Sequence, residues 1–323
     1  MSGVLVVMEQ RSGVWNRMSF EALAAAQQLA AKLGVECSAV VLGADVHSLA
    51  TELASKKLAK VYAAQHDLLN SYTSDGYVAV LEQLIKQNAP AFVLFPHTYQ
   101  VRDFAPALAT RFQQVLISDV IAIHDGPVFV RQLLQGKLNA DYRHTASGPC
   151  FVSVQAGTFR ADAVEEGAST VENFAPQLSA EQLRSKPGEL FRESAQTVDL
   201  SSAPVIVSVG RGIGEQDNLG IVEELASALG AELAASRPIC DNGWLPMERQ
   251  VGSSGQTVSP KLYVAVGISG AIQHLVGMKG SKAVIAINKD ENAPIFEVAD
   301  YGVVGDLFEI VPELTKAIQA AKA

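Results

Sequence analysis

The chain has 323 residues, of which 48% are apolar and 18% charged, and its formal net charge is −9. This length predicts about two domains, with enough apolar residues for a sizeable core. A net negative chain lacks the basic face that nucleic-acid binding needs, so we expect no nucleic acid partner. The longest apolar runs are far shorter than the roughly 20 residues of a membrane helix, so we do not expect a membrane protein.

The three cysteines form no C-x-x-C pair and the histidines no H-x₃-H spacing, which predicts free thiols and no metal site. The N-terminal residues lead directly into a strand, without a basic and apolar leader or an arginine-rich presequence. We therefore expect a cytoplasmic protein of a bacterium. A mature mitochondrial-matrix protein would have the same features.

The first half of the chain alternates apolar strands with amphipathic helices. We predict strands at 4–8, 37–42, 61–64 and 91–95, and helices at 20–33, 46–56, 76–88 and 103–112. Ser19 can cap the first helix and Gly34 can end it. Repeated strand–helix units predict a parallel sheet with helices on both faces. From Asp119, the segments DVIAIHD, PVFVRQLLQGKLNADYRH and PCFVSVQAGTF predict an antiparallel extension of this sheet.

A polar segment with little periodicity, residues 161–203, separates the two halves. We interpret it as a crossover, part of which packs on the first domain as an irregular arm. The domains are then residues 1–190 and 200–323. The second domain should contain strands at 205–209 and 232–235, a helix at 219–229, and a closing helix at 306–320. Pro312 would occupy the first turn of that last helix.

The stretch from 250 to 290 predicts a nucleotide site. It reads as a buried strand, a glycine turn, a helix and a second strand, over residues 261–267, 267–270, 271–278 and 283–288. Such a turn aims backbone N–H groups and the helix dipole at an anion. A crevice outside the carboxyl ends of the strands would collect these polar residues: Ser269, Gln273, His274 and Asn288.

The segment VGRGIG, Val209 to Gly214, follows a strand but does not match a dinucleotide fingerprint. The third glycine would fall at Glu215, and Ser236 and Arg237 stand where an acidic residue would follow the second strand. An NAD site is thus poorly supported, and a plain glycine turn fits better.

The second half of the chain resembles the C-terminal signature of the electron-transfer flavoprotein α-subunit family, over the segment SRPICDNGWLPMERQVGSSGQTVSPKLYVAVGISGAIQHLVGMKGSKAVIAINKDENAPIFEVADYGVVGDLFEIVP. The resemblance implies an α/β protein of two domains, each a mainly parallel sheet with helices on both faces. Residues 200–323 would form a Rossmann-like FAD-binding domain, and residues 1–190 a nucleotide-hydrolase-like domain that makes subunit contacts. The partners would be a β subunit, flavin dehydrogenases such as acyl-CoA dehydrogenases, and a membrane quinone oxidoreductase.

The same resemblance assigns FAD contacts to a set of residues in the second domain: Arg211, Ser236, Arg237, Val251, Gly252, Ser253, Ser254, Ser269, Gly270, Ala271, Ile272, Gln273, His274, Asn288, Asp306 and Leu307. It implies that Arg211, Ser269 and Gln273 contact the diphosphate. Asn288, Asp306 and Leu307 would contact the ribose and adenosine. Simpler interpretations stay open, namely a surface ion pair for Arg237, a structural histidine at 274 and a helix cap at Asp306.

For the isoalloxazine, the resemblance implies Arg237 over the ring, Ser254 at N5 and His274 at the pyrimidine oxygen. Each would favour the reduced, negatively charged flavin. Family members carry threonine where this chain has Ser254, and serine lacks the methyl group that stiffens the rotamer. We therefore expect a looser bond at N5, which affects the cofactor potential more than binding.

The first half offers no Ser-His-Asp or Cys-His arrangement that spacing supports, so we predict no catalytic residue and an electron carrier, not an enzyme. The alternatives are a nicotinamide-dependent oxidoreductase subunit, a non-redox nucleotide-binding protein, and a subunit of a bifurcating flavoprotein.

Overall fold

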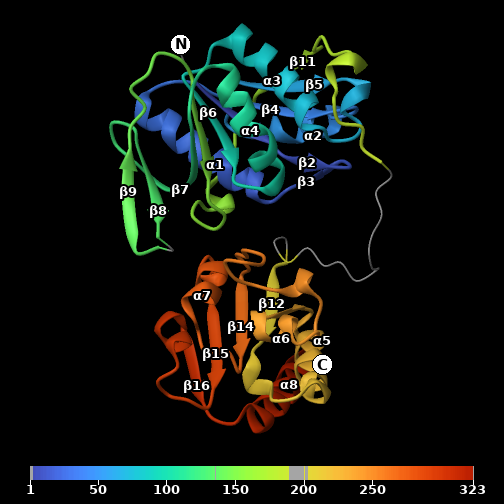
Figure 1. Cartoon of the computed structure of the whole chain (residues 1–323), viewed down its shortest axis with the longest axis vertical. Helices are drawn as coiled ribbons and strands as arrows, with labels where there is room; N and C mark the ends of the chain where they lie inside the picture. The colour runs from blue at the N-terminus through green and yellow to red at the C-terminus, as the bar shows by residue number, and fades with distance from the viewer. Residues whose placement is uncertain (1–2, 135, 189–199, 201–202, 323) are drawn as a thin grey trace. The chain divides into compact units, whose positions relative to one another are not determined.

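The computed structural model describes residues 3–134, 136–188, 200 and 203–322. The chain divides into two compact units, Met1–Leu190 (unit 1) and Phe191–Ala323 (unit 2) (Figure 1). Each unit has its own sheet and its own buried core.

Unit 1 contains a nine-stranded sheet with the order β11-β5-β4-β1-β6-β10-β7-β8-β9. Its strands are β1 (Val4–Met8), β4 (Cys37–Gly43), β5 (Lys60–Gln65), β6 (Phe92–Pro96), β7 (Leu116–His124), β8 (Val128–Leu133), β9 (Leu138–Tyr142), β10 (Cys150–Val154) and β11 (Thr170–Phe174). Pairing is parallel from β11 to β7 and antiparallel from β7 through β9. A small antiparallel hairpin follows β1, formed by β2 (Gln10–Arg11) and β3 (Val14–Trp15).

Two strands of this sheet differ from the sequence prediction. β10 does not join the antiparallel extension but lies between β6 and β7, parallel to both. Its residues are all buried, as expected for a strand covered on both faces. β11 belongs to the segment predicted as an irregular arm, yet it pairs with β5 at the sheet edge. An edge strand has one unpaired side, so its partly exposed, polar sequence is compatible with this position.

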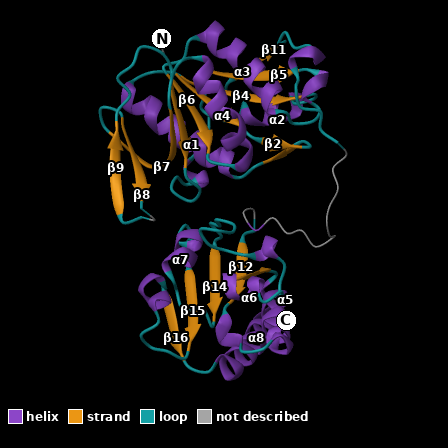
Figure 2. Cartoon of the chain, in the orientation of Figure 1, coloured by secondary structure: helices purple, strands orange, loops and turns teal. Residues whose placement is uncertain are grey.

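Helices cover both faces of the unit 1 sheet (Figure 2). α1 (Met18–Leu33) and α2 (His47–Leu53) pack on one face, while α3 (Ser74–Asn88) and α4 (Tyr99–Arg111) pack on the other. Gly34 ends α1 with φ of +64°, as predicted. Ser19 does not cap α1, because the helix already begins at Met18. Its hydroxyl instead accepts from the Glu9 N–H and donates to the Glu9 carbonyl. Short 3₁₀ turns are η1 (Asp67–Leu69), η2 (Ala161–Ala163) and η3 (Ala180–Gln182).

Unit 2 contains a five-stranded sheet with the order β13-β12-β14-β15-β16, parallel throughout. Its strands are β12 (Val205–Val209), β13 (Glu232–Ala235), β14 (Leu262–Val266), β15 (Val284–Asn288) and β16 (Tyr301–Val304). In chain order this is 2-1-3-4-5, the flavodoxin-like form of a doubly wound sheet. The sequence prediction missed β16, a four-residue strand at the sheet edge whose residues are all exposed.

The helices of unit 2 also lie on both faces. α5 (Gly220–Leu229), α6 (Arg237–Asp241) and α8 (Leu307–Lys322) pack on one face, and α7 (Ile272–Met278) packs on the other. The 3₁₀ turns are η5 (Arg211–Ile213), η6 (Gln216–Leu219), η7 (Met247–Arg249) and η8 (Pro294–Val298). Pro312 lies beyond the first turn of α8, because that helix begins at Leu307. Lacking an N–H, it cannot make the usual helical bond to the Phe308 carbonyl.

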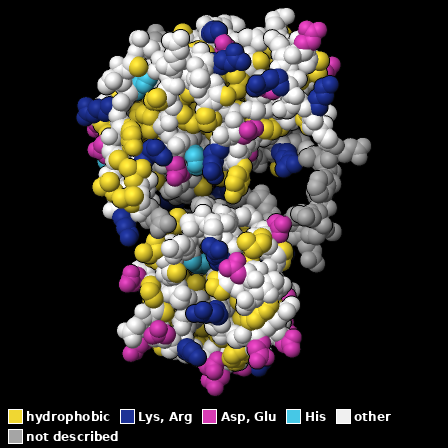
Figure 3. Space-filling view, in the orientation of Figure 1, with side chains coloured by type: hydrophobic (Ala, Val, Ile, Leu, Met, Phe, Trp, Pro, Cys, Tyr) yellow, Lys and Arg dark blue, Asp and Glu magenta, His cyan; other side chains and the backbone are white. Residues whose placement is uncertain are grey.

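On the face shown in Figure 3, basic and acidic side chains are interspersed over unit 1, and acidic side chains gather at the lower end of unit 2. Within the described part of the chain, no helix combines the length and apolar character needed to cross a membrane.

Candidate cofactor site

Two glycine-rich loops meet at the carboxyl edge of the unit 2 sheet, between β12 and β14. Gly210 N–H donates to the Val266 carbonyl at 2.8 Å, and Gly212 N–H donates to the Gly267 carbonyl at 2.9 Å. A Cβ on Gly210 would lie 2.4 Å from the Gly267 oxygen, so the VGRGIG segment needs this glycine for loop packing alone. Strand order reverses between β12 and β14, which is where doubly wound proteins bind ligands.

The turn after β14 gathers several of the predicted residues around this edge. Gly267 and Gly270 both have positive φ, and the Ser269 side chain between them is exposed. Asn288, at the end of β15, donates from Nδ2 to the Ile268 carbonyl at 2.8 Å. Leu307, the first residue of α8, is buried behind Gly267.

Further predicted residues flank the same edge. The Arg211 side chain is exposed in the turn after β12, and Ala271 and Ile272 are exposed where α7 begins. Asp306 accepts from the Phe308 N–H at 2.9 Å, so it does act as a cap for α8. Its own side chain remains exposed, so capping does not prevent contact with a ligand.

A second group of predicted residues surrounds the loop 251–255, which packs on α7. The Val251 N–H donates to the Ala235 carbonyl at 2.9 Å, which places this loop beside the end of β13 and the buried Ser236. The Ser253 N–H donates to the Gln273 carbonyl at 2.7 Å. Together with Gly252, these contacts hold the loop against the first turn of α7, where the Gln273 side chain is exposed.

Arg237 begins α6 next to this loop. Its Nε lies 3.1 Å from the Asp241 Oδ2, so the simpler interpretation as a surface ion pair is observed. The arginine side chain is 67% exposed, and an exposed pair four residues apart contributes only about 0.3–0.5 kcal/mol. The ion pair therefore leaves the guanidinium available to a ligand with a π-system or negative charge.

Ser254 is held more firmly than the sequence prediction supposed. The side-chain amide of Gln250, only 1% exposed, donates from Nε2 to the Ser254 Oγ at 2.9 Å. This bond uses the oxygen of the hydroxyl and leaves its proton free to donate. Gln250 Oε1 is buried and has no hydrogen-bond partner among the described residues.

His274 lies over the face of the sheet. Its Nε2 is 3.0 Å from the hydroxyl of Tyr263, the second residue of β14, and the imidazole is 6% exposed. α7 runs back over the sheet from the glycine turn, and His274, in its first turn, packs beside β14. That His274 shares one cleft with Asn288 stays a prediction. Burial lowers the pKa of His274 to about 4, although the backbone of Val251 opposes this shift. The Nδ1 atom is buried without a well-aligned partner.

These two groups fit FAD. The carboxyl edge offers a guanidinium, a serine hydroxyl and the exposed backbone of a glycine turn to a diphosphate. The second group offers donors of the kind that flavin oxygens and nitrogens accept from, and two of its buried atoms, His274 Nδ1 and Gln250 Oε1, make no well-formed hydrogen bond among the described residues. Buried polar atoms normally have partners, so a ligand that supplies these partners explains them. Among the described residues, no group of three His, Cys, Asp or Glu side chains could hold a metal ion.

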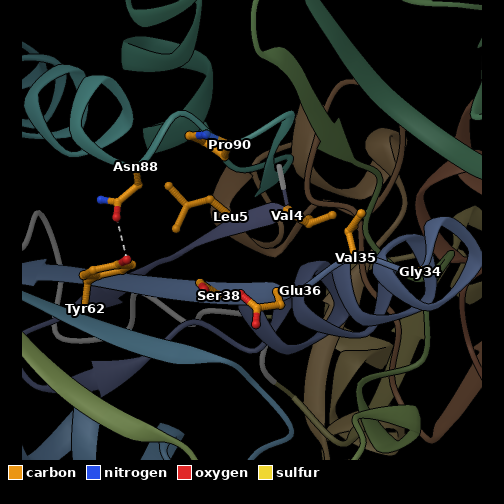
Figure 4. A pocket seen from close by; sticks show the side chains of 10 residues that line it. Val4, Leu5, Gly34, Val35, Glu36, Ser38, Tyr62, Asn88 and Pro90 are labelled. Carbon is orange, nitrogen blue, oxygen red and sulfur yellow. Dashed lines mark hydrogen bonds between the residues drawn. The ribbon is translucent and has the colours of Figure 1, made fainter. Parts of the chain in front are cut away.

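A separate groove of about 650 Å³ lies in unit 1, at the amino ends of β1 and β4 (Figure 4). Tyr62 donates from its hydroxyl to Asn88 Oδ1 at 2.7 Å on one side of it, and Glu36 and Ser38 lie on another. This groove contains none of the predicted site residues. Parallel α/β sheets bind ligands at the opposite, carboxyl edge, so we assign it no cofactor.

The sequence reasoning missed Gln250 and Tyr263. Gln250 directly precedes the loop 251–255, and an amide next to a loop rich in glycine and serine could have suggested a supporting role. Tyr263 stood in an apolar strand, where only its hydroxyl distinguished it from a core residue.

Comparisons with known proteins identify the family of this chain. Residues 4–179 match the family model described as electron transfer flavoprotein domain, and residues 199–279 match the electron transfer flavoprotein FAD-binding domain. The chain is 38% identical to electron transfer flavoprotein subunit alpha of Thermoanaerobacterium thermosaccharolyticum, over 99% of this chain and 98% of that protein. It is 40% identical to the subunit alpha of Bacillus subtilis, with 97% and 96% covered. It is also 37% identical to Protein FixB of Clostridium saccharobutylicum, with 97% and 95% covered. The chain therefore belongs to the α-subunit family of electron transfer flavoproteins, and the family's FAD-binding domain lies in unit 2.

Proposed function

We propose that this chain is the FAD-binding subunit of a heterodimeric electron carrier of the bacterial cytoplasm, paired with a β subunit. The carrier accepts electrons from flavin dehydrogenases such as acyl-CoA dehydrogenases and passes them to a membrane quinone oxidoreductase. The observation that supports this best is the pairing of an exposed guanidinium, Arg237, with a buried imidazole, His274, on either side of the loop 251–255. These groups can tune a flavin, but they include no base placed for substrate chemistry.

The FAD supplies the redox chemistry, and the chain supplies binding and electrostatics. Arg211, Ser269 and Gln273 hold the diphosphate with charge and hydrogen bonds, beside the backbone of the turn 269–272. Asn288, Asp306 and Leu307 contact the ribose and adenosine end.

The loop 251–255 with Ser236 and Arg237 contacts the isoalloxazine, and His274 faces its pyrimidine. A fixed positive charge or a hydrogen-bond donor next to the ring stabilises the negative charge that reduction adds.

A partner subunit is also consistent with the surface of unit 2. Its edge strand and the following helix expose apolar side chains that a second chain could cover: Tyr301 (68%), Val303 (38%), Val304 (56%) and Phe308 (44%).

The test is electron transfer by the purified complex. We would co-express the chain with its β subunit and mix the yellow complex with an acyl-CoA dehydrogenase and its acyl-CoA substrate. Loss of the oxidised-flavin absorbance only when the dehydrogenase is present supports the proposal. Reduction by NADH alone would instead favour the nicotinamide-dependent or bifurcating alternatives. A colourless complex that takes up no FAD would refute the proposal.

A further inference from the structure

Three buried polar side chains lie together under α7 on one face of the unit 2 sheet. Ser208 on β12 and Tyr263 on β14 are both 0% exposed, and His274 on α7 is 6% exposed. The Tyr263 hydroxyl lies 3.0 Å from the His274 Nε2. Ser208 lies on the same sheet face, and its hydroxyl is close enough to Tyr263 to affect the pKa of the phenol.

The chemistry of Ser208, Tyr263 and His274 shows which of their atoms carry protons. Burial raises the pKa of Tyr263 well above its ordinary value, and the Ser208 hydroxyl offsets only part of this rise, so the phenol keeps its proton. Burial lowers the pKa of His274 to about 4, so the imidazole is neutral near pH 7. A neutral imidazole has one donor nitrogen and one acceptor nitrogen. A phenol is the stronger proton donor of the two rings and an imidazole nitrogen the stronger acceptor, so Tyr263 donates to Nε2.

The ring proton of His274 must then be on Nδ1, because the bond at one ring nitrogen decides which nitrogen carries the proton. That N–H is buried, and the backbone of Val251 lies close enough to raise the pKa of the ring, but among the described residues the Nδ1 atom makes no hydrogen bond of good geometry. A buried donor without a well-formed hydrogen bond is costly, so an oxygen acceptor placed opposite it would bind favourably. The loop 251–255 that borders His274 is the part of the site assigned to the flavin.

We propose that Tyr263 is a positioning residue that fixes His274 in the Nδ1–H form, so that the imidazole presents a hydrogen-bond donor to a carbonyl oxygen of the cofactor. This inference rests on the proposed function, in which His274 faces the flavin pyrimidine. Without the phenol hydroxyl, the ring could place its proton on Nε2. The Nδ1 lone pair would then face the carbonyl oxygen and the interaction would change from attraction to repulsion.

The arrangement of Ser208, Tyr263 and His274 also predicts that substitutions at the first two residues change the His274 tautomer to different degrees. The Ser208 Oγ makes no hydrogen bond of good geometry among the described residues, but it lies close enough to lower the pKa of the phenol. A small rotation would let it donate to the Tyr263 oxygen and strengthen the phenol as a donor, as hydrogen bonds in a chain do. Its removal leaves the bond from Tyr263 to His274 in place. Ser208→Ala should therefore change the tautomer less than Tyr263→Phe.

The test combines nitrogen NMR with redox titration on the complex of this chain and its β subunit. With ¹⁵N-labelled histidine, the ring signals of His274 are identified by their loss in His274→Gln, and their shifts tell which nitrogen carries the proton. We expect Nδ1–H in the wild type and an increased Nε2–H population in Tyr263→Phe. The midpoint potential of bound FAD should fall in Tyr263→Phe, by less than in His274→Gln. The control is Tyr77→Phe, which removes another buried tyrosine hydroxyl in unit 1 and should change neither quantity.

The outcomes separate this inference from the function on which it rests. An Nε2–H ring in the wild type, or an unchanged tautomer in Tyr263→Phe, overturns the role of Tyr263 whatever the cofactor does. A potential that falls in His274→Gln but not in Tyr263→Phe overturns it as well and leaves the flavin contact intact. An unchanged potential in His274→Gln removes the histidine from the flavin and overturns both. If Tyr263→Phe fails to fold, an Nε2–H ring in the wild type still overturns the role of Tyr263, and a small increase of Nε2–H in Ser208→Ala supports it.

Discussion

The glycine at position 277 provides a sharp test of how the site is built. Gly277 lies in α7, three residues after His274, and faces the backbone of Gly252 in the loop that carries Ser254. A Cβ added at Gly277 would lie 2.4 Å from the Gly252 nitrogen and 2.5 Å from its Cα. Backbone cannot rotate away as a side chain can, so Gly277→Ala must push the loop and the helix apart.

The size of the effect follows from these distances. Restoring an ordinary contact of 3.4 Å requires the loop to retreat by about 1 Å. The bond from the Ser253 N–H to the Gln273 carbonyl, now 2.7 Å, would then exceed hydrogen-bonding distance. Overpacking costs about 1–3 kcal/mol, and alanine regains roughly 1 kcal/mol of helix propensity, so the net loss of stability should be about 0–2 kcal/mol. FAD affinity should fall at least about tenfold, equivalent to one lost hydrogen bond of about 1.4 kcal/mol.

The assay is rebinding of FAD to the flavin-free complex, followed by flavin fluorescence, with urea unfolding in parallel. Gly220→Ala is the matched control, because Gly220 is also helical, has φ of −51°, and would have no atom within 4 Å of its new Cβ. It should leave FAD affinity unchanged and raise stability by up to about 1 kcal/mol. A Gly277→Ala protein with wild-type affinity would refute the reasoning, since the loop would then not need its present position.

Three other changes test separate parts of the site. Arg237→Ala should keep FAD bound but lower its midpoint potential, with Arg237→Lys recovering only part; spectroelectrochemistry decides, and an unchanged potential removes the arginine from the ring. The double variant Ser269→Ala, Gln273→Ala should lose FAD on dialysis, because each bond to a charged group contributes about 1.5–3 kcal/mol; full retention would place the diphosphate elsewhere. The pKa of His274 is about 4 in the folded chain against an ordinary 6.5, so the unfolded chain binds an extra proton between these values. Stability should therefore fall by roughly 3 kcal/mol as pH drops through this window, and urea unfolding of the flavin-free protein should show a shallower fall in His274→Asn.

Much of the fold could be predicted because most strands of both sheets are buried on both faces. Such strands read as short apolar runs ended by glycine or polar residues, and β13 was predicted with its observed bounds, Glu232–Ala235. The pairing of β10 was harder, because an apolar run shows that a strand is buried but does not show its neighbours. Its uninterrupted sequence, CFVSV, could have indicated a central strand rather than an antiparallel extension with one exposed face.

The strands that the prediction missed lie at sheet edges. β11 (Thr170–Phe174) is partly exposed and polar, and β16 (Tyr301–Val304) is exposed along its whole length. An edge strand pairs on one side only, so neither burial nor alternation marks it clearly in the sequence. β11 and β16 are extended because they pair with the outer edges of β5 and β15, which is a tertiary contact that local sequence does not show.

The candidate site also has some features that local sequence predicts and others that depend on contacts between residues far apart in the chain. The sequence could identify the turn around Gly270 and the loop 251–255, because both follow from local glycine and serine content. It could not show that the loop packs against α7, since the close approach of Gly252 and Gly277 spans a separation that no local pattern records. Nor could it show that α7 places the His274 Nε2 3.0 Å from the hydroxyl of Tyr263 on β14. A larger residue at either glycine would have to push the loop and the helix apart, so it would alter the site without touching a ligand.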